Sequence, residues 1–325
     1  MQDRIDAVFE RPVDQGISLA MVVVHGGDVV AERYGTRPDT VFGPGEPVTA
    51  DSPLISWSMA KSITHAAVGL LVADGRLDLA APADVPEWRG TDKQRITLLD
   101  LLEMRSGLEF VEDYVDGDTS HCIAMLYGDG AGDHAGYAAA LPLIHEPGTV
   151  WNYSSGTTNI ITRILGRVIG GGREDMEAFL RDRLFDPVGM TSAVPAFDEA
   201  GTWVGSSYVH ATARDFARFG ELYRNDGLAE SGERVLPPGW ADHGRTFVAH
   251  DPTDDLELGF DYGRHWWMWP EFGGSIAAHG YEGQFTIVVP DRELTVVHLG
   301  KTDSAVRRHV VGYLRDLIHA VPINA

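Results

Sequence analysis

The sequence predicts an α/β protein in which one antiparallel β-sheet is formed from both chain ends and flanked by helices. Three observations indicate this fold: β-rich runs near the start, helical patterns through the middle, and β-branched runs followed by a helix at the end. We expect residues 1–75 and 241–325 to form the sheet domain and 76–240 to form an inserted, mostly helical subdomain. The active site is expected between them.

The first segment predicts a hairpin followed by a helix. "ISLAMVVVHGGDVVAERYG" contains two β-rich runs around the turn Gly26-Gly27. From about Ser58 to Asp74, apolar residues recur at helical spacing, and Gly75 is expected to end that helix.

The middle segment predicts three helices. "TLLDLLEMRSG" is expected to stop at Gly107 and "TTNIITRILGRVIG" at Gly170. "TARDFARFGELYRNDG" opens with Thr212 and Asp215 at the spacing of a capping box and closes on Gly227. Asp215 is therefore interpreted as a helix cap and not as a catalytic acid.

The last segment predicts a second hairpin and a closing helix. "GQFTIVVP" and "ELTVVHLG" are β-branched runs on either side of the turn Pro290-Asp291. "SAVRRHVVGYLRDLIHAV" then has the pattern of an amphipathic helix.

Charge and cysteine content exclude several classes of function. A formal net charge of −22 over 325 residues argues against nucleic acid and against an anionic membrane surface as partners. The single cysteine, Cys122, rules out an internal disulfide and a cysteine-built metal centre. No metal or other cofactor is expected, and the oligomeric state is left open, a dimer included.

The N-terminus and the apolar runs bear on location. "MQDRIDAVFE" lacks the basic and apolar regions of a signal peptide, so a cytoplasmic protein is expected, with export left open. The longest apolar runs, such as "LAMVVV", are too short to span a bilayer.

Ser58-x-x-Lys61 is the first candidate for chemistry. Residues three apart share a helical face, so the hydroxyl can touch the amine, and a buried neutral lysine can accept a proton from serine. The alternative is that Lys61 is an ordinary solvated helix residue. Its apolar neighbours and the presence of only three lysines in the chain weigh against that alternative.

Two further segments supply partners for this pair. In "EPGTVWNYSSGTTN", Tyr153 lies between a turn and a helix, where its hydroxyl can approach Ser58 and act as base and then acid. A purely structural tyrosine is the alternative. In "AAHGYEGQFTIVVP", Gly280 permits close approach of a substrate backbone, and the N–H of Tyr281 can join that of Ser58 in an oxyanion hole.

In this order, the motifs S-x-x-K, Y-x-S and H-G-x-x-G-Q resemble those of the penicillin-recognising serine hydrolases, within them the class C β-lactamase-like branch. "SMAKSIT", "FVEDY" and "HGYEGQ" are most similar to the aminohexanoate-oligomer hydrolases and their carboxylesterase relatives. The resemblance covers about residues 18 to 318.

The resemblance implies roles for matching residues. Ser58 would be the acylated nucleophile, Lys61 its activating partner and Tyr153 the general base and proton shuttle, with Ser58 and Tyr281 holding the oxyanion. Tyr114 would reach a substrate amide. The further substrate-binding residues are expected to be Ser155, His279, Gly280 and Trp267, the last within an aromatic wall for an apolar acyl chain.

Two departures from the β-lactamase pattern affect the expected substrate. Ser155 replaces a common asparagine, and His279 replaces a lysine, so no permanent cation is expected for a substrate carboxylate. "GKTD" at Lys301 is set aside because only a helix is expected after it. These features favour a small-molecule ester or short linear amide. A β-lactamase or D-alanyl carboxypeptidase is the first alternative, and a catalytically silent binding relative is the second.

Overall fold

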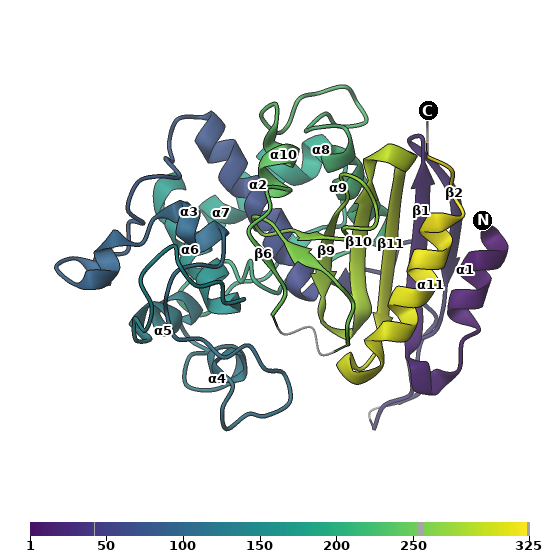
Figure 1. Cartoon of the computed structure of the whole chain (residues 1–325), viewed down its shortest axis with the longest axis horizontal. Coiled ribbons are helices and arrows are strands. Elements are labelled where there is room, and N and C mark those ends of the chain that lie inside the picture. The colour runs from purple at the N-terminus through teal and green to yellow at the C-terminus, as the bar shows by residue number, and fades with distance from the viewer. Residues whose placement is uncertain (42, 253–255, 324–325) are drawn as a thin grey trace.

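The structure is a computed structural model that describes residues 1–41, 43–252 and 256–323. Within these residues, an eight-stranded antiparallel sheet has the strand order β2-β1-β11-β10-β9-β8-β7-β6, and a small sheet has the order β3-β5-β4 (Figure 1). The large sheet lies between two helices of the chain ends and the helical part of the molecule.

The strands are β1 (Ile17–His25), β2 (Asp28–Tyr34), β3 (Leu54–Ile55), β4 (Val194–Pro195), β5 (Val209–Ala211), β6 (Ala249–His250), β7 (Asp261–Tyr262), β8 (Trp267–Met268), β9 (Ile276–Gly280), β10 (Gln284–Val289) and β11 (Leu294–Lys301). The α-helices are α1 (Gln2–Phe9), α2 (Ala60–Ala73), α3 (Leu98–Leu102), α4 (His121–Tyr127), α5 (His134–Ala140), α6 (Ser155–Ile169), α7 (Arg173–Leu180), α8 (Asp186–Val188), α9 (Ala213–Arg224), α10 (Trp240–Gly244) and α11 (Arg307–His319).

The predicted fold class is confirmed, because strands from both chain ends pair in one sheet. β1 lies antiparallel to β11, with Val23 opposite Val296 at the centre of the pair. Both predicted hairpins, β1–β2 and β10–β11, are present. The turn between β1 and β2 needs positive φ at both of its glycines, Gly26 (61°) and Gly27 (93°), which explains why glycine occupies both positions.

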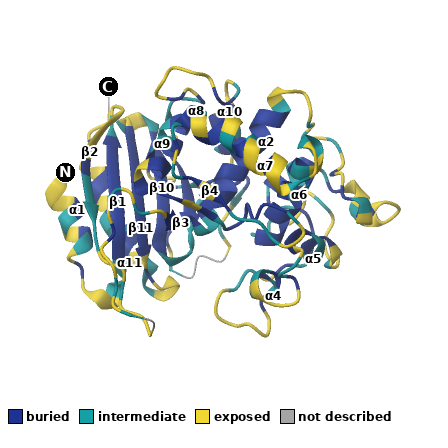
Figure 2. Cartoon of the chain, turned by 180° about the vertical axis from the view of Figure 1, so that it is seen from behind, coloured by how far each residue is buried: buried dark blue, intermediate teal, exposed yellow. Residues whose placement is uncertain are grey.

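Both faces of the sheet are covered. On the outer face, α1 and α11 pack over buried sheet residues such as Phe285 and Ile287. On the inner face, α2 and α9 pack into a core that continues into the helical part of the chain. Figure 2 shows β1, β10 and β11 as buried along nearly their whole length. None of the helices in the described ranges is both long and apolar enough to cross a membrane.

The predicted helices form with altered bounds. The helix predicted to begin at about Ser58 begins at Ala60 instead. Ser58 lies just before it, in the 3₁₀ turn η2 (Trp57–Met59). The helix expected to reach Gly107 ends at Leu102, because Met104 takes a left-handed backbone (φ 56°). The Met104 carbonyl then accepts a hydrogen bond from Asn152 N, 2.8 Å away, instead of continuing the helix.

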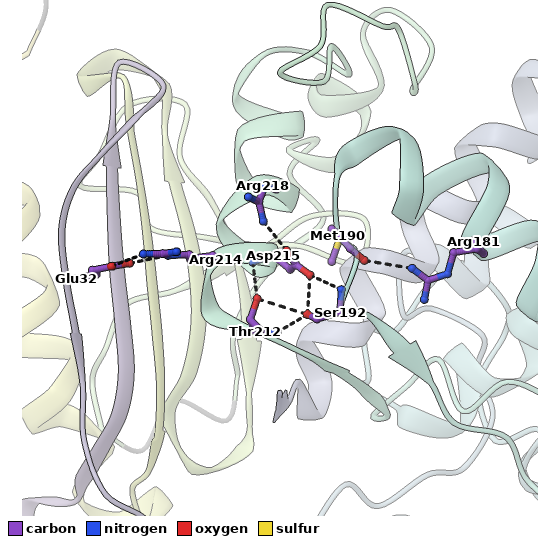
Figure 3. A network of polar contacts seen from close by, with 8 residues as sticks. All are labelled: Glu32, Arg181, Met190, Ser192, Thr212, Arg214, Asp215 and Arg218. Carbon is purple, nitrogen blue, oxygen red and sulfur yellow. Dashed lines mark hydrogen bonds and ion pairs between the residues drawn. The ribbon is translucent and has the colours of Figure 1, made fainter. Parts of the chain in front are cut away.

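The capping role of Asp215 differs in detail from the prediction. Thr212 Oγ1 accepts a hydrogen bond from Asp215 N at 3.2 Å, as the N-cap of α9 should. The Asp215 carboxylate, however, does not return to Thr212. It accepts hydrogen bonds from Ser192 N (2.8 Å) and Ser192 Oγ (2.6 Å) and pairs with Arg218 (Figure 3).

Helix α9 falls inside the predicted 76–240 subdomain, yet it packs on the inner face of the sheet against β10 and β11. Arg214, at its start, pairs with Glu32 on β2 (Figure 3). The helices α3 to α7 lie beyond α2, away from the sheet (Figure 1). This arrangement is compatible with the predicted division into a sheet domain and a helical subdomain. That division remains a prediction.

Replacing Asp215 by alanine is expected to lower the free energy of unfolding by about 2–4 kcal/mol, because the half-buried Ser192 N–H and hydroxyl lose the buried carboxylate that accepts from them. Urea unfolding followed by circular dichroism measures this loss. Asp186→Ala is the matched control, since Asp186 pairs with Arg181 while half exposed, and it should cost less than about 1 kcal/mol. Equal losses in the two variants would contradict the structural role of Asp215.

Candidate active site

Ser58 is presented by a strained turn. The preceding Trp57 has φ 45°, a left-handed conformation that costs a non-glycine residue about 1–3 kcal/mol. Two contacts hold it: Ser56 Oγ donates to the Trp57 carbonyl at 2.9 Å, and Trp57 Nε1 donates to Glu282 Oε2 at 3.1 Å. The turn places Ser58 at the wall of a cavity of about 420 Å³, directly before α2.

Lys61 is buried, with 2% of its surface exposed. Its Nζ lies 3.0 Å from Ser58 Oγ, 2.9 Å from Ser155 Oγ and 3.0 Å from the carbonyl oxygen of Ser206. Burial lowers the pKa of this amine below its usual value near 10.5. The solvated-residue alternative for Lys61 is therefore contradicted.

The hydrogen bonds around Lys61 determine where its lone pair points. The Ser206 carbonyl can only accept, and the Ser155 hydroxyl donates its own hydrogen to Glu112 Oε1 at 2.6 Å. Both groups must therefore accept from Lys61. A neutral amine has two hydrogens, and these two contacts use both. Its lone pair is left for Ser58, whose hydroxyl can donate to it, so neutral Lys61 is arranged as a proton acceptor for Ser58.

Glu112 is the residue that the sequence analysis missed. One oxygen accepts from Ser155 N at 2.7 Å, and the other accepts from the hydroxyls of Ser155 (2.6 Å) and Tyr114 (2.7 Å). Its charge also raises the pKa of Lys61, in opposition to burial. The only sequence signal was its place in "FVEDY", because its partners are distant in the chain.

Tyr153 lies beside the serine–lysine pair. The centre of its ring is 4.8 Å from Lys61 Nζ, and its hydroxyl contacts Ser58. Burial and the Glu112 charge raise the pKa of Tyr153, although the contact with Ser58 acts in the opposite direction. The resting form of Tyr153 in the free protein is therefore the neutral phenol, and not the phenolate that a general base would need. Neutral Tyr153 is suited to donating a proton to a leaving group, with Lys61 receiving the proton of Ser58.

The end of β9 borders Ser58. A Cβ on Gly280 would lie 2.4 Å from the Ser56 carbonyl oxygen, so the close approach that requires glycine is made by the protein's own backbone. Tyr281 follows directly and lines the same cavity as Ser58. Its N–H as a partner of Ser58 in an oxyanion hole stays a prediction.

His279 is neutral and already hydrogen-bonded. Trp269 Nε1 donates to its Nε2 at 2.8 Å, its ring stacks on Trp267 at 5.2 Å, and burial holds its pKa well below 6.5. It lines the cavity without supplying a positive charge.

The three neighbouring tryptophans have different environments. Trp266 and Trp269 are fully buried, whereas Trp267, on β8, lines the cavity together with Trp151 and Tyr153. Tyr114 also lines it, with its ring 4.9 Å from that of Tyr281. The structure thus brings every residue of the predicted site except Lys61 and Ser155 to the lining of this cavity. Ser155 lies behind, against Lys61 and Glu112.

Two basic residues lie at or near the cavity. Lys301, at the end of β11, pairs with Glu282 at 2.9 Å and lies outside the cavity lining. Arg307, at the start of α11, lines the cavity, and its buried Nε has no hydrogen-bond partner among the described residues. The sequence analysis considered only the third motif for a cation, whereas α11 brings Arg307 to the cavity wall from a segment remote from that motif.

Across the described ranges, no group of three or more His, Cys, Asp or Glu side chains is arranged to hold a metal ion.

Comparisons with known proteins agree with this geometry. A family model described as Beta-lactamase matches residues 5–320. The 6-aminohexanoate-dimer hydrolase of Paenarthrobacter ureafaciens is 28% identical over 330 residues, covering 94% of this chain and 80% of that protein. Penicillin-binding protein 4 of Amycolatopsis lactamdurans is 29% identical over 318 residues, covering 87% and 78%.

A solved structure is similar over the same range. A Bacillus anthracis protein provisionally named 6-aminohexanoate-dimer hydrolase superposes with a TM-score of 0.77 at 26% identity. The match covers 95% of this chain and 80% of that one.

Glu112→Gln is expected to move the acid limb of the pH dependence of kcat/KM to lower pH. The reaction needs neutral Lys61, so activity falls as pH drops through the pKa of that amine. Removing the carboxylate that raises this pKa lowers it further. A loss of about 10- to 100-fold in kcat should accompany the shift, because Ser155 and Tyr114 lose their anchor.

Ester hydrolysis measured from pH 5 to 10 checks this prediction. Glu109→Gln is the control, since Glu109 lies in the same segment and contributes no shift to the pKa of Lys61. An acid limb that stays in place, or moves to higher pH, would show that Glu112 does not act through Lys61.

Proposed function

The chain belongs to the β-lactamase family, and from that premise we propose that it hydrolyses carboxylic esters or short linear amides through an acyl-enzyme on Ser58. Hydrolase activity follows from the family and its relatives, whereas the serine mechanism and the substrate class are the proposal. The observation that carries it is the arrangement of Lys61, whose two amine hydrogens are used by Ser155 and Ser206 and whose lone pair is left for Ser58.

The reaction proceeds in two steps. Ser58 Oγ attacks the substrate carbonyl carbon as its proton passes to Lys61, and Tyr153 protonates the leaving oxygen or nitrogen as that bond breaks. Water then attacks the acyl-enzyme as one of its protons passes to deprotonated Tyr153, and Lys61 returns its extra proton to Ser58 Oγ as the acid leaves, so that all three residues regain their starting forms. The backbone N–H groups of Ser58 and Tyr281 would stabilise the oxyanion in both steps.

Two features support esters and linear amides as substrates. The relative from Paenarthrobacter is named for hydrolysis of the 6-aminohexanoate dimer, and its likeness spans nearly the whole chain. In addition, the third motif presents neutral His279, hydrogen-bonded to Trp269, where a β-lactamase would present lysine.

A β-lactamase or D-alanyl carboxypeptidase activity is the second candidate, and Arg307 is the observation in its favour. Its guanidinium group could attract a substrate carboxylate into the larger cavity, and its buried Nε has no partner within the described part of the chain.

A fluorophosphonate probe is expected to label Ser58, with the adduct identified by peptide mass spectrometry.

Lys61→Ala, Lys61→Arg and Tyr153→Phe should each lower kcat/KM for esters by about 10⁴-fold or more, because these residues act as one unit with the nucleophile. Lys61→Arg is the informative control, because arginine keeps a basic side chain at the site but stays protonated and cannot accept a proton from Ser58. Retained activity in that variant would rule out lysine as the proton acceptor. An unlabelled Ser58 in folded protein that is inert toward esters and amides would favour the silent binding relative.

The substrate class is tested by comparing p-nitrophenyl acetate, a linear amide oligomer and nitrocefin under one set of conditions. We expect kcat/KM for nitrocefin to be at least about 100-fold below that of the ester, a difference of about 2.7 kcal/mol in transition-state stabilisation. Nitrocefin hydrolysis at the ester's rate, reduced by Arg307→Ala, would establish the second candidate instead.

A further inference from the structure

A second, smaller cavity opens beside Ser58. It encloses about 80 Å³, compared with about 420 Å³ for the larger one. Ser58, Tyr114 and Tyr281 line both cavities. Ser58 therefore lies at the junction of the two cavities. When the bond next to the substrate carbonyl breaks at Ser58, one part of the substrate lies in each cavity.

The smaller cavity is mainly apolar. Helix α4 supplies Cys122, Ile123 and Leu126 to its wall, and Trp57 lines the opposite side. The Trp57 ring packs edge-on against Tyr281 at 5.9 Å. Because burial raises the pKa of the Cys122 thiol, that side chain is uncharged and adds no ionic group to the wall.

The proton donor identifies which half of the substrate enters which cavity. Tyr153 lines only the larger cavity, in company with Trp151 and Trp267. A general acid must reach the atom that it protonates, so the leaving group lies on the side of Tyr153. Ser155, which lines the smaller cavity, cannot replace it, because its hydrogen is donated to Glu112.

We propose that the smaller cavity holds the acyl chain of the substrate and that Ile123 and Leu126 limit its length. This inference rests on the proposed function. When Ser58 Oγ forms its bond to the carbonyl carbon and the bond to the leaving group breaks, the acyl chain stays in the smaller cavity. The leaving group receives its proton from Tyr153 and departs through the larger cavity. Water later releases the short-chain acid from Ser58.

The size of the cavity determines the acyl chains that it accepts. A volume of 80 Å³ equals about two to three times the share of one water in the liquid, enough for a chain of about three to five carbons. Trp267 was expected to wall the acyl chain. It lies instead with Tyr153 and faces the leaving group, so the larger cavity is free to take bulky alcohols or amines.

A series of p-nitrophenyl esters from acetyl to octanoyl tests this assignment with a constant leaving group. We expect kcat/KM to rise about fourfold per added methylene up to four or five carbons, because each methylene is buried. It should then fall at least tenfold by octanoyl, which does not fit.

Leu126→Ala and Ile123→Ala are expected to move the best chain length up by about two carbons, and Leu126→Phe to restrict the enzyme to acetyl and propionyl esters. Leu141→Ala is the matched control, since Leu141 is a half-buried leucine that lines neither cavity, and its chain-length profile should equal that of the unaltered protein.

Labelling of Ser58 by a fluorophosphonate is followed in each variant, which separates the acyl cavity from the proposed function. If Ser58 is labelled but octanoyl esters are preferred, or the Leu126 variants keep the original profile, the acyl assignment is overturned and the serine hydrolase stands. If Ser58 is not labelled in the unaltered protein, both are overturned. Leu126→Phe leaves no void in the protein. If the alanine variants fold poorly, its chain-length profile still tests the acyl assignment.

Discussion

The buried amine of Lys61 is the constraint on which the rest of the site depends. A lysine that is 98% buried is stable only if its polar contacts are satisfied, and burial makes its neutral form accessible. Ser155 and the Ser206 carbonyl accept its two hydrogens, and Ser58 receives the remaining lone pair. Glu112 fixes the direction of the Ser155 hydroxyl, so that one carboxylate determines which way a proton can move at Ser58.

Three elements that are distant in the chain, α2, α6 and the end of β9, meet around Ser58 and Lys61. Helix α2 carries Lys61 between the sheet and the helical part of the chain, while α6 presents Ser155 at its first residue. Gly280, at the end of β9, lies in close contact with the backbone of Ser56. Glu282, just after that strand, accepts a hydrogen bond from the Trp57 ring and so helps to hold Trp57 in its strained conformation. The helices of the inner face thus position the proton acceptor, and the sheet positions the nucleophile against it.

Asymmetry around Ser58 follows from the same elements. Tyr153, Trp151 and Trp267 border one side, and the short helix α4 borders the other. Because Tyr153 approaches Ser58 from the first side, we propose that the leaving group departs on that side. Arg307 lines the larger cavity and not the smaller one, so in the proposed binding mode its positive charge would act on the leaving group, and the small cavity would select the acyl chain by size.

Local features were predictable from the sequence because they depend on spacing along the chain. The Thr212 cap of α9 and the contact between Ser58 and Lys61 join residues three positions apart, and each hairpin joins two strands that are neighbours in the chain. Only the tertiary structure decided the role of Glu112, the neutrality of His279, the cation at Arg307 and the side on which Trp267 lies. Each of these depends on neighbours tens to hundreds of residues away, because burial and charge act through space and not along the sequence.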